Sequence, residues 1–91
     1  MGLKSTTSCL GYQQITSLSS AQALTVPVGA TMALIVPEAQ AVRWRDDGVN
    51  PTASVGMPIA VGESFNYDGD LKRIRFIQQT TSATLNISYY A

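Results

Sequence analysis

Two short stretches hold most of the side chains that could do chemistry. The first, VRWRDDG (Val42–Gly48), contains two arginines, a tryptophan and two aspartates, and the second, DGDLKRIRF (Asp68–Phe76), repeats much of that combination in roughly reverse order. The whole 91-residue chain has only six Lys and Arg and six Asp and Glu. Carboxylates at such positions could act as an acid–base pair or bind calcium, and arginine forks could bind carboxylates or phosphates.

Catalysis is the chemistry that these residues support least. The chain has no histidine, which excludes a histidine base and a serine–histidine triad. Asp46 and Asp47 should point to opposite faces if the strand extends to them, so they should not converge as a glycosidase pair. Asp68 and Asp70 flank Gly69 in a sequence typical of a turn, and the other oxygen ligands of a calcium loop are missing. We therefore expect no enzyme, no cofactor and no metal site.

Composition limits the class of partner. The formal net charge is zero and charged residues make up 13% of the chain, which argues against nucleic-acid binding and favours packing into an assembly. Cys9 is the only cysteine, so no internal disulfide can form and a reducing compartment is expected. The longest apolar run, VPVGATMALIVP, is too short to span a bilayer. A chain of this size gains stability from neighbours, so we expect a homo-oligomer that binds neither nucleic acid nor membrane.

Alternating apolar and polar residues predict strands throughout the chain. In AVRWRD, Val42 and Trp44 fall on one face and Arg43 and Arg45 on the other. The continuous apolar run TMALIV (31–36) predicts a strand buried on both faces. The remaining predicted strands are YQQITSL (12–18), ALTV (23–26), ESFNY (63–67), RIRFI (73–77) and TLNISYY (84–90).

Turn residues separate these strands at short intervals. Glycine, proline or aspartate lies between successive runs, and the strands recur about every 8–12 residues. This pattern predicts an all-β antiparallel sandwich of about seven or eight short strands, in jelly-roll or another Greek-key order. The sandwich should be a single domain over residues 12–91. Residues 1–11 are small, polar and aperiodic, and predict a flexible N-terminal arm.

The arginines allow two interpretations. They could simply solvate the outer face of a sheet beside the strand-end aspartates, where ion pairs add little stability. Alternatively, two Arg-x-Arg faces on neighbouring strands could bind carboxylates or carbonyls of another subunit. The candidate contact residues are Arg43, Arg45, Arg73 and Arg75, together with the two tyrosines expected to be exposed, Tyr12 and Tyr90. A sugar-stacking platform built from the aromatic residues is a further alternative.

Several segments of the sequence are similar to those of a known protein family. LTVPVGATMALIVPEAQAVRWRDDGVNPTASVGMPIAVGESF, YDGDLKRIRFI and LNISYY resemble a family of small virion-associated proteins of tailed bacteriophages and prophages. The resemblance runs from about Tyr12 to Tyr90, and VRWRDDG, PTASVGM and ISYY are its most specific parts. It implies a non-enzymatic β-sandwich that is made in the bacterial cytoplasm and assembled into the virion.

These observations together lead to one main hypothesis. The chain is expected to be a phage structural protein, foremost a head decoration or cement protein seated on the major capsid protein. Its partners would be further copies of itself and other virion proteins. A tail or connector accessory protein is the first alternative. A carbohydrate-binding module for host adsorption is the second.

Overall fold

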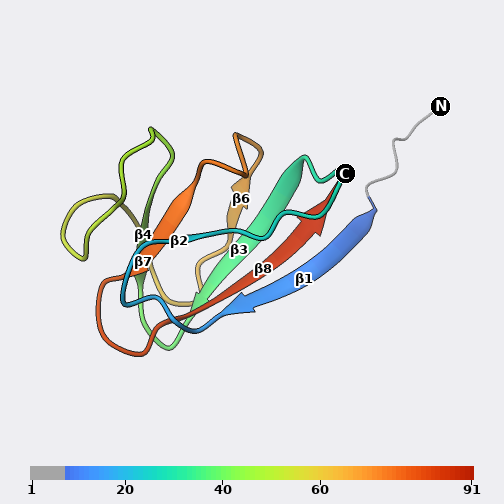
Figure 1. Cartoon of the computed structure of the whole chain (residues 1–91). Helices are drawn as coiled ribbons and strands as arrows, with labels where there is room; N and C mark the ends of the chain where they lie inside the picture. The colour runs from blue at the N-terminus through green and yellow to red at the C-terminus, as the bar shows by residue number, and fades with distance from the viewer. Residues whose placement is uncertain (1–7) are drawn as a thin grey trace.

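The computed structural model describes residues 8–91, and all the regular structure in that range is β. Eight strands run through the chain (Figure 1). They are β1 (Cys9–Ile15), β2 (Gln22–Ala23), β3 (Met32–Glu38), β4 (Val42–Arg45), β5 (Met57–Ile59), β6 (Phe65–Tyr67), β7 (Arg75–Gln78) and β8 (Thr84–Tyr90). No helix in this range is long and apolar enough to cross a membrane.

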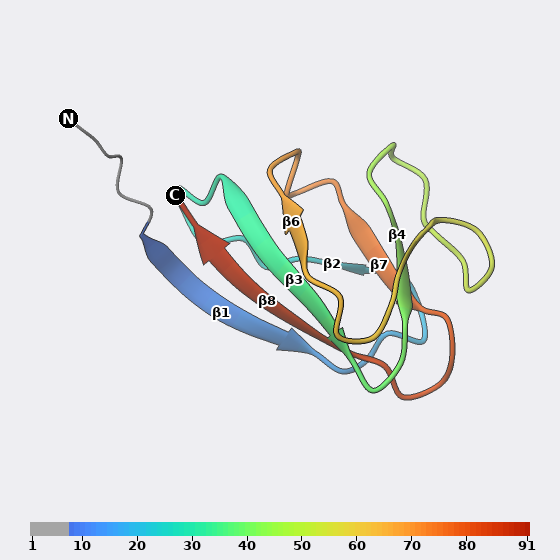
Figure 2. The same cartoon turned by 180° about the vertical axis from the view of Figure 1, so that it is seen from behind.

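The strands form two antiparallel sheets of four. One sheet has the order β1-β8-β3-β6 and the other the order β2-β7-β4-β5. Hydrogen bonds join four pairs of strands: β1–β8, β2–β7, β3–β6 and β4–β5. The chain therefore folds back on itself at the β4–β5 loop and forms one long hairpin. Successive strand pairs of this hairpin belong alternately to the two sheets. The two views show the layers from either side (Figure 2). The prediction of an antiparallel β-sandwich is confirmed, and this strand order is that of a jelly roll.

Alternate residues of the long strands form the core between the sheets. Leu85, Ile87 and Tyr89 of β8 are buried, while the residues between them are half-buried on the outer face. The opposite sheet contributes Val42 of β4 and Phe76 of β7 to the same cluster, and both are fully buried. The period of two that predicts the strands is therefore also what fills the core.

One predicted burial is wrong. The run TMALIV was expected to be covered on both faces, but only its inward residues Ala33 and Ile35 are fully buried. Leu34 and Val36 lie half-buried on the outer face of the sheet. A sandwich of two layers has no third layer to cover that face, so the apolar run exceeds what this chain alone can bury.

The predicted N-terminal arm extends too far. Residues 9–11 belong to β1, because β8 continues to Tyr90 and offers a partner for each of them except one bulged position, Leu10. Beyond the strand, Ser8 and Ala91 exchange two backbone hydrogen bonds of 3.0 and 3.1 Å. Residues 1–7 of the predicted arm lie outside the described residues. The strand expected over 12–18 therefore starts at Cys9 and ends at Ile15.

Three further points of the strand prediction need correction. Arg73 precedes β7 instead of belonging to it, because the N–H groups of Arg73 and Ile74 donate to the carbonyl of Asp70 in a tight turn. The segment 57–59, which is not among the strands predicted from the sequence, forms the short edge strand β5. Only residues 22–23 of the ALTV region are strand, since just two residues there pair with β7.

The core assignment predicts a large difference between two identical substitutions. Val42 is 0% exposed and Val28 is 101% exposed at the tip of a turn. We expect Val42→Ala to lower the free energy of unfolding by about 2 kcal/mol, because it removes buried methyl groups and leaves a cavity. Val28→Ala should change it by less than about 0.5 kcal/mol. Urea denaturation measures both, and equal effects would contradict the assigned core.

Candidate functional site

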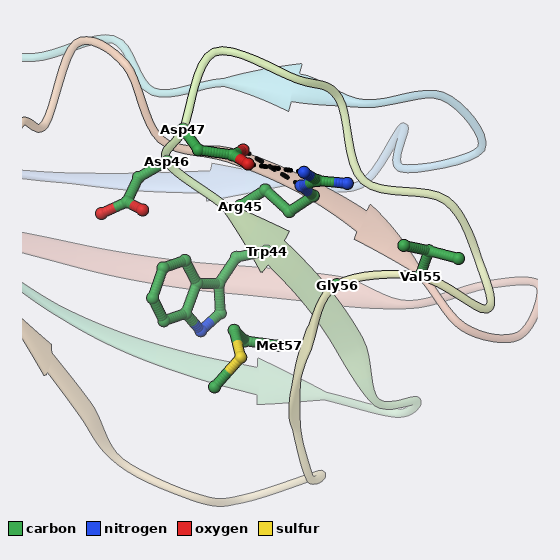
Figure 3. Close-up of a pocket in the computed structure, with 7 residues that line it drawn as sticks. All are labelled: Trp44, Arg45, Asp46, Asp47, Val55, Gly56 and Met57. Atoms are coloured by element: carbon green, nitrogen blue, oxygen red, sulfur yellow. Dashed lines mark hydrogen bonds and ion pairs between the residues drawn. The ribbon is translucent and has the colours of Figure 1, made fainter.

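A shallow pocket lies where β4 leaves the sandwich and its loop returns as β5. Its volume is about 470 Å³. Trp44 and Met57, which are cross-strand partners, lie together on one side of it (Figure 3). The other lining residues are Arg45, Asp46, Asp47, Val55 and Gly56. The pocket thus combines an apolar wall with charged groups, and it contains most of the VRWRDDG stretch.

Trp44 belongs only partly to the core. It was predicted to be a core residue, and its indole does pack against the buried cluster but remains half-buried. The ring stacks on Phe65 at a centroid distance of 5.1 Å and meets Tyr67 in a tilted arrangement at 5.8 Å. These contacts fix the indole in place, and the part left uncovered becomes a rigid wall of the pocket.

Asp46 is held away from Asp47 by a tyrosine. The Tyr67 hydroxyl donates to Asp46 Oδ2 at 2.6 Å. Burial first, and this hydrogen bond second, raise the pKa of Tyr67 to about 12. The two carboxylates point in different directions (Figure 3). The geometry therefore matches the expectation that they do not converge.

The DGD sequence has a packing role at the same place. A Cβ on Gly69 would collide with the ring and hydroxyl of Tyr67. Glycine is therefore required there for the chain to pass close to the tyrosine that holds Asp46. Neither Asp68 nor Asp70 belongs to a group of possible metal ligands, and no such group of three exists within residues 8–91.

Arg45 and Asp47 form a bidentate ion pair at the rim. Nε donates to Oδ1 at 3.0 Å and Nη2 to Oδ2 at 2.5 Å. The hydrogen bonds from Arg45 lower the pKa of Asp47 to about 2. Because the folded-state pKa is depressed, whatever stability the pair contributes is present above the ordinary carboxyl pKa and is lost as the pH falls toward 2. Asp47 is exposed and Arg45 is half-buried, so water and salt screen the pair and its contribution is small.

Arg43 anchors the loop that closes the pocket. Its Nε donates to the carbonyl of Ala53 at 3.2 Å and its Nη1 to the carbonyl of Gly56 at 2.8 Å. With its amide oxygen turned toward the guanidinium, Gln79 accepts from Nε and Nη2 at 2.9 Å. Gly56 has a φ of +145°, and a Cβ there would approach the carbonyl oxygen of Trp44 to 3.1 Å. No pattern in the sequence indicates that Arg43 and Gly56 act together.

The four predicted arginines lie in different environments. β4 and β7 are neighbours as expected, with Arg45 opposite Arg75 and Arg43 opposite Ile77. Arg75 donates to the carbonyls of Lys72 and Ile74, so three of the four guanidiniums have bonding partners within the chain. A contact between these arginines and another subunit stays a prediction.

The two predicted tyrosines lie on the other sheet. Tyr12 of β1 is 64% exposed, and its hydroxyl donates to Asn86 Oδ1 at 2.5 Å. Tyr90 of β8 is half-buried, which makes it less exposed than expected. Tyr12 and Tyr90 therefore do not share a surface with the arginines of β4 and β7.

No sequence pattern predicts the most exposed part of this region. Four large apolar side chains between residues 49 and 61 are more than half exposed. These residues, called here the apolar rim, are Val49, Val55, Met57 and Val61. The alternation of apolar and polar residues does not reveal them, because three of the four lie in loops. Two of them, Val55 and Met57, line the pocket together with Trp44, and exposed apolar groups beside an aromatic wall are typical of a surface that binds another molecule.

Comparisons with protein-family models, curated proteins and solved structures found no match to this chain. The interpretation of the pocket therefore depends on its geometry and on the residues that form it.

The anchoring role of Arg43 predicts a local effect on the loop. Arg43→Ala removes the bonds to Ala53 and Gly56, so we expect the amides of residues 52–56 to exchange with solvent about tenfold faster or more. Arg75→Ala is the matched control, because Arg75 also donates to backbone carbonyls but to none in this loop. Hydrogen-exchange mass spectrometry measures both. Equal loop exchange in the two variants would show that Arg43 does not hold the loop.

Proposed function

We propose that this chain is a non-enzymatic structural protein of a tailed-phage particle, and foremost a head decoration protein. It would act by seating one end of its sandwich on other virion proteins, such as the major capsid protein. The resemblance of VRWRDDG, PTASVGM and ISYY to phage virion-associated proteins supports the assignment to a particle. The jelly-roll strand order is compatible with it, since viral capsid domains are among the proteins that use this fold.

The apolar rim is the observation that carries a binding role. Its members Val55 and Met57 line the pocket with the half-buried Trp44, next to a loop that Arg43 ties to the sheet through Ala53 and Gly56. Tryptophan, methionine and arginine are enriched in protein-binding surfaces, and this pocket is lined by Trp44, Met57 and Arg45. Because the loop is anchored, little conformational freedom would be lost when a partner covers it.

Low charge favours a particle surface with many copies. The chain has a net charge of zero, so copies placed side by side repel one another little. Each contact through a patch of this size can be weak. Repeated contacts between linked subunits of a shell still sum to a stable attachment.

Localisation on purified particles tests the proposal. Gold-labelled antibody against this chain should decorate the heads of particles from a lysate of the host that carries its gene. Label on the tails would instead support the tail or connector alternative. Particles that carry no label at all would contradict a structural role.

A substitution in the apolar rim tests whether that end makes the contact. Met57 is 57% exposed, so Met57→Asp should leave the fold intact but place a charge where the partner is desolvated. We expect it to lower the copy number per particle severalfold, as measured by quantitative mass spectrometry. Val28→Asp is the control, because Val28 is exposed in the turn between β2 and β3, and this turn lies at the opposite end of the molecule from the β4–β5 loop (Figure 1). Equal occupancy by both variants would contradict binding through the apolar rim.

Carbohydrate binding is a second candidate that one observation favours. Trp44 offers an apolar wall beside the Arg45–Asp47 pair, and sugars are commonly held between aromatic rings and charged hydrogen-bonding groups. Lectins also use jelly rolls. Binding of the purified chain to host surface polysaccharide, together with unlabelled particles, would favour this candidate over the structural one.

A further inference from the structure

The four sheet edges of this sandwich differ in how well they are protected. β2 has two residues, β6 has three, and β5 has three of which one is Pro58. Short strands and proline are devices that keep an edge from pairing with another chain. β1 has seven residues, CLGYQQI, with no proline and no charge. Apart from the bulge at Leu10, β1 is thus the one long edge without such a device in the described chain.

The backbone groups at this edge can be assigned from the ladder. Ser8 and Ala91 form a hydrogen-bonded pair, so Tyr90 directs its backbone groups away from β1 and toward β3. β8 is regularly paired with β3, and its residues 89, 87 and 85 therefore face β1. Their partners Gly11, Gln13 and Ile15 are bonded to β8. The N–H and C=O groups of Tyr12 and Gln14 consequently point out of the sheet, toward its open edge.

The absence of charged residues in β1 and β8 makes this edge compatible with pairing to the same edge of a second copy. A two-fold axis places each residue of a surface against the same surface, so any charge near the axis meets its own kind. β1 and the adjacent β8 contain no charged residue. The side chains of Tyr12 and Gln14 on the outer face both bond to Asn86, which is also neutral. Self-pairing of this edge therefore brings no like charges together.

We propose that β1 pairs antiparallel with β1 of a second copy, which joins two four-stranded sheets into one sheet of eight. The register places Tyr12 opposite Gln14 of the partner subunit and Gln14 opposite Tyr12 of the partner subunit. This register joins every outward-pointing N–H and C=O between Tyr12 and Gln14 in four backbone hydrogen bonds, using only residues of the regular strand. The pairing is independent of which virion protein the chain binds, so it goes beyond the proposed function.

A pair of charge variants tests both the edge and the register. Tyr12→Lys with Gln14→Lys places two lysines opposite each other on both sides of the axis, so the dimer should weaken. Tyr12→Lys with Gln14→Glu places a lysine opposite a glutamate twice, so the dimer should be retained. Both double variants lose the same side-chain bonds to Asn86, which makes them matched. Sedimentation of the purified full chain, with reductant present to keep Cys9 from forming disulfides, measures the dissociation constant.

We expect the dissociation constant of the Lys/Lys variant to exceed that of the Lys/Glu variant about tenfold or more. Both variants should keep the wild-type sheet signal in circular dichroism, since positions 12 and 14 face solvent. A wild-type chain that remains monomeric at the highest concentration reached would overturn the proposal. So would a dimer whose dissociation constant is the same in both variants. Because this experiment needs no particles, failure of the proposed function would not affect its outcome.

Discussion

The burial of one face of each sheet against the other is the interaction on which every other feature of this molecule depends. The inward rows of β3 and β8 meet Val42 and Phe76 from the second sheet, and these residues are almost completely removed from water. The jelly-roll order follows from the same constraint. Folding the long hairpin in half lets both of its arms contribute an apolar face to a single core.

A core this small leaves apolar surface uncovered in two places. At the β4–β5 end, Met57 and Val55 stay exposed beside Trp44. On the outer face of the β1-β8-β3-β6 sheet, Leu34 and Val36 are only half-buried, and at one edge of the same sheet β1 has backbone groups without a strand partner. The two places lie on different parts of the molecule. The proposed contacts with a virion protein and with a second copy therefore use different surfaces.

The fold was largely predictable because burial in a sandwich follows a period of two. Val42 with Trp44, and Leu85 with Ile87, reveal their strands by alternation alone. β5 was not predicted, because a strand of three residues that include Pro58 is too short to show a period of two. The start of β1 was not predicted for a different reason. Cys9 and Gly11 are strand residues only because β8 provides a partner for them, and pairing between distant segments leaves no local pattern.

The candidate site was predictable only in part. The ion pair of Arg45 with Asp47 is local, and the sequence placed these charges together. The role of Arg43 depends on where the loop returns, which one sequence does not specify. The same is true of the Tyr67–Asp46 hydrogen bond, which joins residues 21 positions apart. Contacts across the fold thus convert an apparent polar strand end into an anchored pocket.

The most direct measurement of whether neighbours complete this molecule is the exchange rate of three adjacent amides of β1. The Gln13 amide is bonded to β8 and should exchange slowly at every protein concentration. The amides of Tyr12 and Gln14 should exchange rapidly in dilute solution and become protected as the concentration rises. Tyr12 and Gln14 amides that exchange rapidly at all concentrations would contradict an edge that is completed by a second copy.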